Sequence, residues 1–311
     1  MKRVRIFWTG GFDSTFRVSQ LSKFDIEIEP HYMCDQRATK KYELNAIREI
    51  RECLESLEDT KAKFLPLIYH PIGDLKVNKE VTGAFNSVFE KHYMGRQYEY
   101  LGKVSKMYPG IETGVHVHDK FTYILEDEGC LKKVSDDIIG DYYVVDESLA
   151  SKDLAILSKD FHFPLVKYTK KQMKKEFIDN NLEEVMNKTW FCFSPIDGKP
   201  CGKCNACKGT IEEGLYGRFE KKALARYVLR KLGYYSLKWL YRVIINRLKR
   251  DKARYSGYLK KGWKKYKGLS KRDYKKFLKA LKNDLKKYLR LLKQDIKKYG
   301  GYFKYLFLRN V

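Results

Sequence analysis

Short apolar runs alternate with amphipathic stretches through the first two thirds of the chain. The runs are rich in β-branched and aromatic residues, as buried strands are, whereas the stretches between them repeat at helical spacing. Strands are expected at Val4–Trp8, Ile26–Cys34, Phe64–His70, Glu112–Val117, Tyr142–Val145 and Pro164–Tyr168. Helices are expected at Asp13–Leu21, Tyr42–Leu57, Thr82–His92, Leu149–Leu157 and Lys170–Asn180. This alternation predicts an α/β fold with a Rossmann-like parallel sheet and helices on both faces.

The pattern changes after Gly217, where Lys, Arg, Tyr and Leu dominate and proline is absent. Apolar residues in 237–248 and 271–299 recur every three or four positions, which predicts two amphipathic helices. Ser270 and Asp273 are placed to cap the second of these helices, and Gly300 follows its end. We therefore expect two domains, an α/β domain over 1–215 and a basic all-α domain over 216–311.

The charge of the chain is concentrated in this second domain. The whole chain has 64 Lys and Arg against 39 Asp and Glu, a formal charge of +25. Residues 216–311 contain 32 of the basic residues and only 5 of the acidic ones, so the first domain is nearly neutral. Lysines interleaved with aromatic residues suit nucleic acid, although an anionic membrane surface, protein or glycan would also fit. We expect a polyanionic partner for 216–311, with nucleic acid as the first candidate.

The composition also bears on the compartment. A hydrophobic fraction of 43% excludes a wholly disordered chain, and no run of about 18 uncharged apolar residues is available to span a membrane. The apolar run at the N-terminus ends at Thr9, which is too early for a secretory signal. The chain has 7 cysteines, an odd number, and most of them lie within 192–207. This distribution is typical of metal binding rather than of disulfides, and we expect a cytoplasmic protein.

The first candidate site is a glycine pair directly after the first expected strand. Residues Thr9–Thr15 read TGGFDST and lead into the first expected helix. Ligands of open α/β sheets bind at this edge, where adjacent glycines allow close approach and backbone N–H groups at the helix start attract phosphate. Asp13 would repel a bare polyphosphate, so it either caps the helix or binds Mg²⁺. The alternative to a phosphate site is a plain strand-to-helix turn.

The second candidate site is a group of four cysteines. Cys192, Cys201, Cys204 and Cys207 are close together in the sequence, with prolines and glycines between them. Four thiolates suit tetrahedral Zn²⁺ in a closed, structural site, so residues 190–208 are expected to form a zinc knuckle. An iron–sulfur cluster stays the alternative, because thiolate spacing alone does not choose between the two metals.

Together the two motifs resemble those of the PP-loop ATP pyrophosphatases, and most closely the 7-cyano-7-deazaguanine synthase family of queuosine biosynthesis. The glycine loop of that family reads SGGxDST, with Ser where this chain has Thr9. Pro164–Lys170 is similar to the family's PL-x-x-x-[TS]-K step, and Thr189–Cys192 with Cys201–Cys207 is similar to its zinc segment. Gly114–Asp119 is similar to a GVNxxD-like strand end. The resemblance extends over residues 3–210.

The resemblance implies an adenine nucleotide alpha hydrolase-like fold and an ATP-dependent ligase that forms carbon–nitrogen bonds. Such an enzyme adenylates a carboxylate or amide oxygen, releases pyrophosphate and lets ammonia displace AMP. The resemblance also implies ATP, Mg²⁺ and Zn²⁺ as cofactors, a small-molecule carboxylate as substrate and a homodimer. Asp13 and Ser14 are the expected catalytic residues. The residues expected to bind ATP are Trp8, Thr9, Gly10, Gly11, Phe12, Asp13, Ser14, Thr15 and Asp119.

The residues that correspond to the family's substrate-binding motifs differ from those motifs. The family's second strand runs into DYGQRHxxE, whereas here Arg37 is not followed by the His and Glu43 is displaced. Lys120–Ile124 replaces the stretch that helps hold the deazaguanine in the family. ATP use is therefore a firmer expectation than a deazapurine substrate. The alternatives are an RNA-modifying PP-loop enzyme that adenylates or thiolates a base, and a nucleotide-binding protein without catalysis.

Two weaker signals bear on these alternatives. Cys34, at the end of the second expected strand, and Cys130 are candidate sulfur carriers for thiolation, unless they are ordinary buried thiols. His116 and His118 alternate with valines and would share one face of the strand Glu112–Val117. On that face they would contact ATP or act as an acid/base pair, unless the strand is simply half exposed.

Overall fold

The computed structural model describes residues 1–35 and 37–231, so the helices expected at 237–248 and 271–299 lie outside the described residues. The described residues divide into two compact units, one of Met1–Gly198 with Glu212–Gly214 and the other of Lys199–Ile211 with residues 215–231. The expected boundary between residues 215 and 216 stays a prediction. In the part of the chain that the structure describes, no helix is long and apolar enough to cross a membrane.

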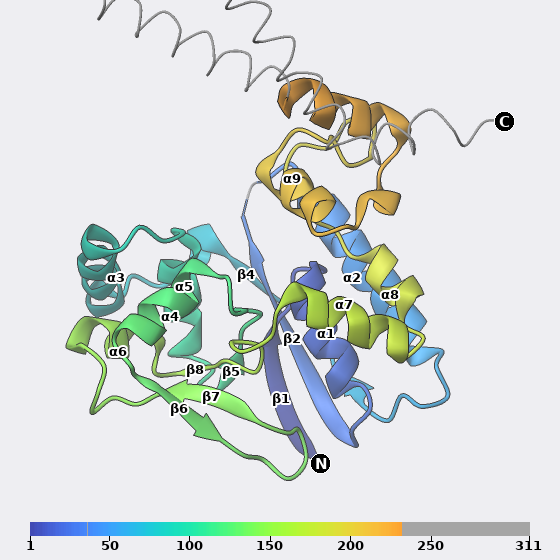
Figure 1. Ribbon diagram of the computed structural model, residues 1–311. Helices are drawn as coiled ribbons and strands as arrows, with labels where there is room; N and C mark the ends of the chain where they lie inside the picture. Colours follow the sequence, from blue (N-terminus) through green and yellow to red (C-terminus); the bar gives the residue numbers. More distant parts are fainter. Residues whose placement is uncertain (36, 232–311) are drawn as a thin grey trace, which may run out of the picture. The chain divides into compact units, whose positions relative to one another are not determined.

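The first unit is built on a parallel sheet, which confirms the expected fold class (Figure 1). The strands are β1 (Lys2–Phe7), β2 (Ile26–Cys34), β3 (Lys63–Phe64), β4 (Ile68–Pro71), β5 (Ile111–Glu112), β6 (Leu131–Val134), β7 (Tyr142–Val145) and β8 (Phe161–His162). The strand order is β3-β2-β1-β5-β8, and β4 also pairs with β2. Every pairing in this sheet is parallel. The two central strands, β1 and β2, bury Val4, Ile6, Ile26 and Ile28, and charged residues stand between these apolar ones.

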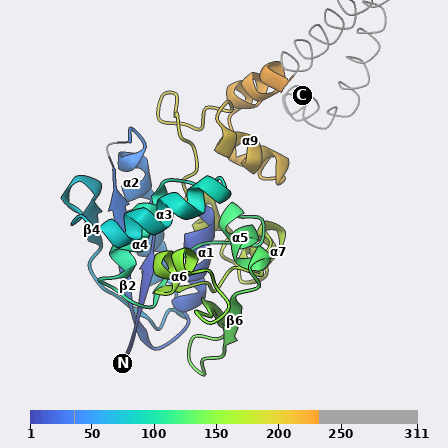
Figure 2. The same cartoon turned by 90° about the vertical axis from the view of Figure 1, so that its left-hand side faces the viewer.

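Helices cover both faces of the sheet. The helices of the first unit are α1 (Phe12–Leu21), α2 (Lys40–Glu55), α3 (Lys79–Lys91), α4 (Gln97–Ser105), α5 (Lys120–Asp127), α6 (Lys152–Ser158), α7 (Lys170–Asp179) and α8 (Glu183–Lys188), with a short 3₁₀ turn at η1 (Ile72–Asp74). Helix α9 (Asn205–Glu212) and the 3₁₀ turn η2 (Tyr216–Arg218) belong mostly to the second unit. Helices α1, α2, α7 and α8 pack together on one side, and α3, α4 and α6 pack together on the other (Figures 1 and 2). The second group covers a core of aromatic and aliphatic side chains that includes Phe85, Phe121 and Phe161.

Several expected strands differ from the observed ones. The strand expected at Pro164–Tyr168 was a wrong prediction, because these residues form a turn whose Leu165 and Val166 side chains are fully buried. The strand expected at Glu112–Val117 ends at Glu112, and the one at Phe64–His70 is divided between β3 and β4. Strand β7 has the expected bounds, but it pairs with β6 in a separate antiparallel hairpin.

The second unit contains most of α9, the turn η2 and a helical stretch at 221–231. Arg226 donates a hydrogen bond from Nε to the carbonyl oxygen of Cys201 over 2.9 Å. Lys199 forms an ion pair with Glu220. These contacts fasten the segment with the last three cysteines to the helix that follows it.

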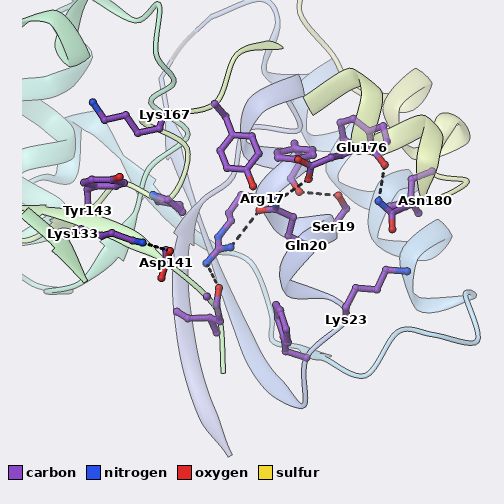
Figure 3. Close-up of a pocket in the computed structure, with 18 residues that line it drawn as sticks. Arg17, Ser19, Gln20, Lys23, Lys133, Asp141, Tyr143, Lys167, Glu176 and Asn180 are labelled. Atoms are coloured by element: carbon purple, nitrogen blue, oxygen red, sulfur yellow. Dashed lines mark hydrogen bonds and ion pairs between the residues drawn. The ribbon is translucent and has the colours of Figure 1, made fainter. Parts of the chain in front are cut away.

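A buried ion pair joins α1 to β5 within the first unit. Arg17 donates two hydrogen bonds to the Glu112 carboxylate, both of 2.8 Å, and a third of 3.2 Å to the carbonyl oxygen of Ile139. The Arg17 and Glu112 side chains are 5% and 0% exposed. The same guanidinium lines a cavity of about 530 Å³ between α1, α7 and the β6–β7 hairpin, where Lys133 and Asp141 face one another (Figure 3). None of the residues Thr9–Thr15 lines this cavity.

Candidate active site

The chain order in the sheet reverses between β1 and β5. Strand β1 continues to β2 on one side, whereas β5 and β8 extend the sheet on the other. In an open parallel sheet such a reversal opens a crevice at the carboxyl ends of the two strands, which is the usual ligand site. The loop after β1 contains the glycine pair, and the loop after β5 contains Thr113 and Gly114. The sequence motif and the topology therefore indicate the same place.

Glycines bring backbone segments into close contact around this crevice. Gly10 has φ of +66°, and a Cβ atom there would lie 2.8 Å from the carbonyl oxygen of Glu43 in α2. A Cβ atom on Gly114 would lie 3.1 Å from the amide nitrogen of Ser14, in the first turn of α1. Side chains at these two positions would push the glycine loop away from α2 or from the end of β5.

Three polar side-chain atoms beside the crevice are buried without a hydrogen-bond partner. Within residues 1–35 and 37–231, these atoms include Oδ1 of Asp13, Oγ of Ser14 and Oγ1 of Thr113. Ser14 is 6% exposed and Thr113 is 4% exposed. Buried polar groups are nearly always paired, since leaving one unpaired costs about 1–3 kcal/mol. Three such atoms, two from the first turn of α1 and one from the loop after β5, indicate a site shaped for a polar ligand.

Lys170 is the cation closest to this group. Its Nζ lies 3.8 Å from Oδ2 of Asp13 and 3.6 Å from Oε1 of Glu213. Lys170 is the first residue of α7, which Thr169 caps through a capping box with Gln172. A lysine at a helix N-terminus is electrostatically unfavourable for the helix, so its position is better explained by the carboxylates it faces.

Burial and crowding of carboxylates shift the pKa values of this cluster. The pKa of Asp13 is raised to about 6, chiefly by burial; Lys170 opposes this shift and the nearby Asp119 adds to it. Burial likewise raises the pKa of Glu213. A bound cation would reverse the shift at Asp13, because a positive charge favours the ionised carboxylate.

Asp119 and His116 lie on the loop after β5. The Asp119 carboxylate caps α5 by accepting the N–H of Phe121 over 2.8 Å, and it accepts the hydroxyl of Tyr98 over 2.9 Å. Burial lowers the pKa of His116 to about 4, and Nδ1 of its ring accepts the N–H of His118 over 3.1 Å. His116 is therefore neutral at pH 7, with its proton on Nε2.

The shared strand face expected for His116 and His118 was a wrong prediction. Strand β5 ends at Glu112, so both residues lie in the loop that leads to α5. The His118 side chain is exposed, whereas that of His116 is half-buried. The two rings meet edge to face, 6.3 Å apart, and only His116 belongs to the crevice.

The other residues expected to bind ATP are mostly packed inside the unit. Trp8 and Thr15 are fully buried, and the indole Nε1 of Trp8 donates to Oγ1 of Thr15 over 3.0 Å. Phe12 packs against Phe177 with ring centroids 5.5 Å apart. Thr9 is exposed. Any contact of Trp8, Phe12 or Thr15 with a nucleotide would thus come from the backbone, and their roles stay predictions.

A polar network at the end of β2 supports the glycine loop from behind, and the sequence motifs did not indicate it. The buried carboxylate of Glu43 accepts hydrogen bonds from the Tyr32 hydroxyl, over 2.8 Å, and from the Thr39 hydroxyl, over 2.9 Å. Arg37 lies 3.5 Å from the same carboxylate. The sequence nevertheless contained a signal that Glu43 is buried. Glu43 falls on the same face of α2 as the buried residues Ala46, Ile47, Ile50 and Leu54.

The four cysteines form a compact cluster. The sulfur atoms of Cys192, Cys201, Cys204 and Cys207 all lie within 4.8 Å of one another. Those of Cys201 and Cys207 are 3.8 Å apart, which is the separation that a tetrahedral metal with bonds of about 2.3 Å requires. Backbone N–H groups of residues 203 and 204 point to the Cys201 sulfur, as they do around metal-bound thiolates. The donor set and spacing fit a structural zinc ion.

Cys130, one of the two candidate sulfur carriers, lies outside this cluster. Its side chain is fully buried, and its thiol donates to the carbonyl oxygen of Leu125 over 3.5 Å. Burial raises the pKa of this thiol to about 11, so little thiolate forms at neutral pH. The observation favours a structural role for Cys130 over sulfur transfer.

One comparison with known proteins bears on this site. Residues 148–214 match the family model described as Queuosine biosynthesis protein QueC. The match includes Lys170, Glu213 and all four cysteines, but not the glycine loop, which is therefore a separate observation. It indicates an ATP-utilising enzyme of the PP-loop type. No protein in the curated collection that was searched matches the chain.

Proposed function

We propose that the protein is an ATP-dependent ligase that adenylates a carboxylate or amide oxygen and lets ammonia displace AMP, as 7-cyano-7-deazaguanine synthases do. The observation that supports it most is the group of unpaired polar atoms at the switch point, on Asp13, Ser14 and Thr113. The family match at 148–214 adds Lys170 and Glu213 on the opposite side of the same crevice.

The crevice has the groups that adenylation requires. The N–H groups at the start of α1 and the hydroxyl of Ser14 would hold the pyrophosphate as the bond from Pα to the bridging oxygen breaks. Mg²⁺, held by Asp13, would neutralise the charge that develops on the leaving pyrophosphate. Lys170 would balance the remaining carboxylate charge, which in the free protein it already does.

The second half of the reaction needs a nucleophile and a water-poor site. Ammonia attacks the carbonyl carbon of the acyl adenylate, the carbon–oxygen bond to AMP breaks, and the released proton leaves with solvent or a nearby base. A second adenylation, now of the amide oxygen, would let AMP leave with two protons lost from nitrogen, which gives a nitrile. Because the Nδ1 atom of His116 accepts the N–H of His118, the ring offers the N–H of Nε2 as a hydrogen-bond donor.

The test is turnover by the full chain with ATP, Mg²⁺, ammonium and 7-carboxy-7-deazaguanine. We expect AMP and pyrophosphate in equal amounts, with the nitrile detected by mass spectrometry. AMP formation without conversion of this compound would keep the reaction class and exclude the substrate. A folded, zinc-loaded protein that neither binds nor consumes ATP would refute the proposal.

We also propose that the four cysteines bind zinc. Metal analysis of the purified full chain is expected to find about one zinc per chain and a colourless protein. Cys204→Ser should lower the zinc content severalfold, whereas Cys53→Ser, which changes a thiol outside the cluster, should not. Stoichiometric iron with a visible chromophore would contradict the assignment.

The basic residues 216–311 are proposed to hold this enzyme near a polyanion, with nucleic acid as the first candidate. The proposal is supported by their composition, with 32 Lys and Arg against 5 Asp and Glu. A homodimer and a cytoplasmic location complete the proposal. In this proposal the basic residues 216–311 determine where the enzyme is located, whereas the crevice determines which reaction it catalyses.

A further inference from the structure

The segment that carries the first cysteine also contacts the glycine loop. The backbone N–H of Trp190 donates to the carbonyl oxygen of Gly10 over 2.8 Å. The Trp190 carbonyl oxygen lies 3.7 Å from the position that a Cβ atom on Gly11 would take. Two residues before Cys192, the chain thus lies directly against both glycines of the loop.

The Trp190 side chain connects the same loop to Cys192 and to α2. Its indole Nε1 donates to the carbonyl oxygen of Cys192 over 2.9 Å. Its ring stacks on Tyr42 with centroids 4.6 Å apart and planes 13° from parallel. Tyr42 is in the first turns of α2, the helix whose Glu43 carbonyl oxygen and Ala46 Cβ would lie within 3.0 Å of a Cβ atom on Gly10. The glycine loop is therefore held between α2 and the Trp190 segment.

We propose that Trp190 is a positioning residue that couples metal binding at the cysteine cluster to ATP binding at the glycine loop. This inference rests on the proposed function, since it takes the glycine loop as the ATP site. It adds a regulation of that site, because loss of the metal would lower the affinity for ATP without changing any residue that touches the nucleotide.

The physical reason lies in the freedom of the two chain segments. Adjacent glycines have the largest conformational entropy of any dipeptide, so the loop needs outside contacts to hold a ligand-ready shape. A metal at Cys192 would fix the peptide whose carbonyl oxygen accepts the indole N–H. Loss of the metal would let that carbonyl oxygen turn away from the indole, and the hydrogen bond from the Trp190 backbone N–H to Gly10 would weaken with it. Linkage then requires that ATP strengthens metal binding by the same factor.

The experiment measures zinc affinity of the full chain by chelator competition, with and without the non-hydrolysable analogue α,β-methylene-ATP and Mg²⁺. In the wild type we expect the analogue to tighten zinc binding about tenfold. Trp190→Phe keeps an aromatic ring for the stack on Tyr42 but removes the indole N–H, and should reduce the effect to about twofold. Phe193→Leu is the matched control, since Phe193 is the residue directly after Cys192 but is 58% exposed, and it should keep the tenfold effect.

Tyr42→Leu tests the same connection without altering residues 189–207. It removes the stack from the α2 side and should also reduce the tightening of zinc binding to about twofold. The proposal can therefore still be tested if Trp190→Phe fails to fold. Full coupling in both variants would overturn it. So would a wild type that binds the analogue equally well with and without zinc. A zinc-loaded wild type that does not bind the analogue at all would instead refute the proposed function, and this inference with it.

Discussion

Asp13→Asn is expected to reduce ATP-dependent AMP formation by about 100- to 1,000-fold, the range seen when one group that stabilises a transition-state charge is removed. The amide keeps the size of the side chain but cannot carry the negative charge that a Mg²⁺ ion on the polyphosphate needs. Activity is measured as pyrophosphate release at saturating ATP. Asp141→Asn is the control, because Asp141 pairs with Lys133 far along the chain from the crevice and should retain activity within about twofold. Wild-type turnover by Asp13→Asn would exclude Asp13 from the catalytic machinery.

The same substitution is expected to stabilise the fold in the absence of ATP. The pKa of Asp13 is about 6 in the folded protein, against 3.8 for an ordinary Asp, so folding favours the protonated carboxyl. The stability that this proton provides is complete below pH 4 and is lost as the pH rises through 6. At pH 7 Asp13→Asn should therefore raise the free energy of unfolding, by up to about 3 kcal/mol, and the gain should vanish near pH 4. Urea denaturation at both pH values measures it, and a loss of stability at pH 7 would contradict the electrostatic account.

Arg17→Met is expected to lower the free energy of unfolding by about 3–5 kcal/mol, because it leaves the Glu112 carboxylate buried without its partner. Both hydrogen bonds of the pair are 2.8 Å long, and Glu112 is fully buried. The pair also sets the position of Thr113 and Gly114, which follow Glu112 directly. Weaker nucleotide binding should accompany the lower stability. Urea titration and calorimetry with the ATP analogue measure the two effects.

A double replacement separates lost pairing from lost packing. Arg17→Met with Glu112→Leu removes both charges, and should be more stable than either single variant by several kcal/mol. If each single variant lowered the free energy of unfolding by less than about 1 kcal/mol, the pair would contribute no more than an exposed ion pair does. That result would contradict the account of Arg17 and Glu112 as a buried pair.

The central strands could be predicted from the sequence because β-branched and aromatic residues recur in them. Strand β2 has the expected bounds, Ile26 and Cys34, although Glu27, Glu29 and His31 stand among its apolar residues. Leu165 and Val166 misled the same reasoning, since they are as apolar and as buried as strand residues but belong to a turn. Helix α5 was missed because its buried residues, Phe121, Ile124 and Leu125, span too few turns to show a clear period.

The candidate site was predictable only where a local motif marks it. The glycine loop and the cysteines are each contiguous enough in sequence to be recognised by their spacing. Lys170 meets Asp13 only through the packing of α7 beside α1, and Glu213, which follows α9, joins them by pairing with Lys170. No spacing rule relates residues that far apart in the chain. Glu43 was read as a displaced family residue, whereas the structure gives it a place behind the loop.

The close approach at Gly114 has a consequence for how relatives of this protein can diverge. A methyl group there would come within 3.1 Å of a backbone nitrogen in α1, which no rotamer change relieves. The spacing between the two halves of the sheet at the crevice is thus fixed by the main chain. Under the proposed function, a change of acceptor substrate would come from exchanging side chains such as His116 in the loop after β5 or Lys120 at the start of α5, and not from widening the gap. A saturation library at position 114 should return glycine alone, while one at position 120 should return many residues.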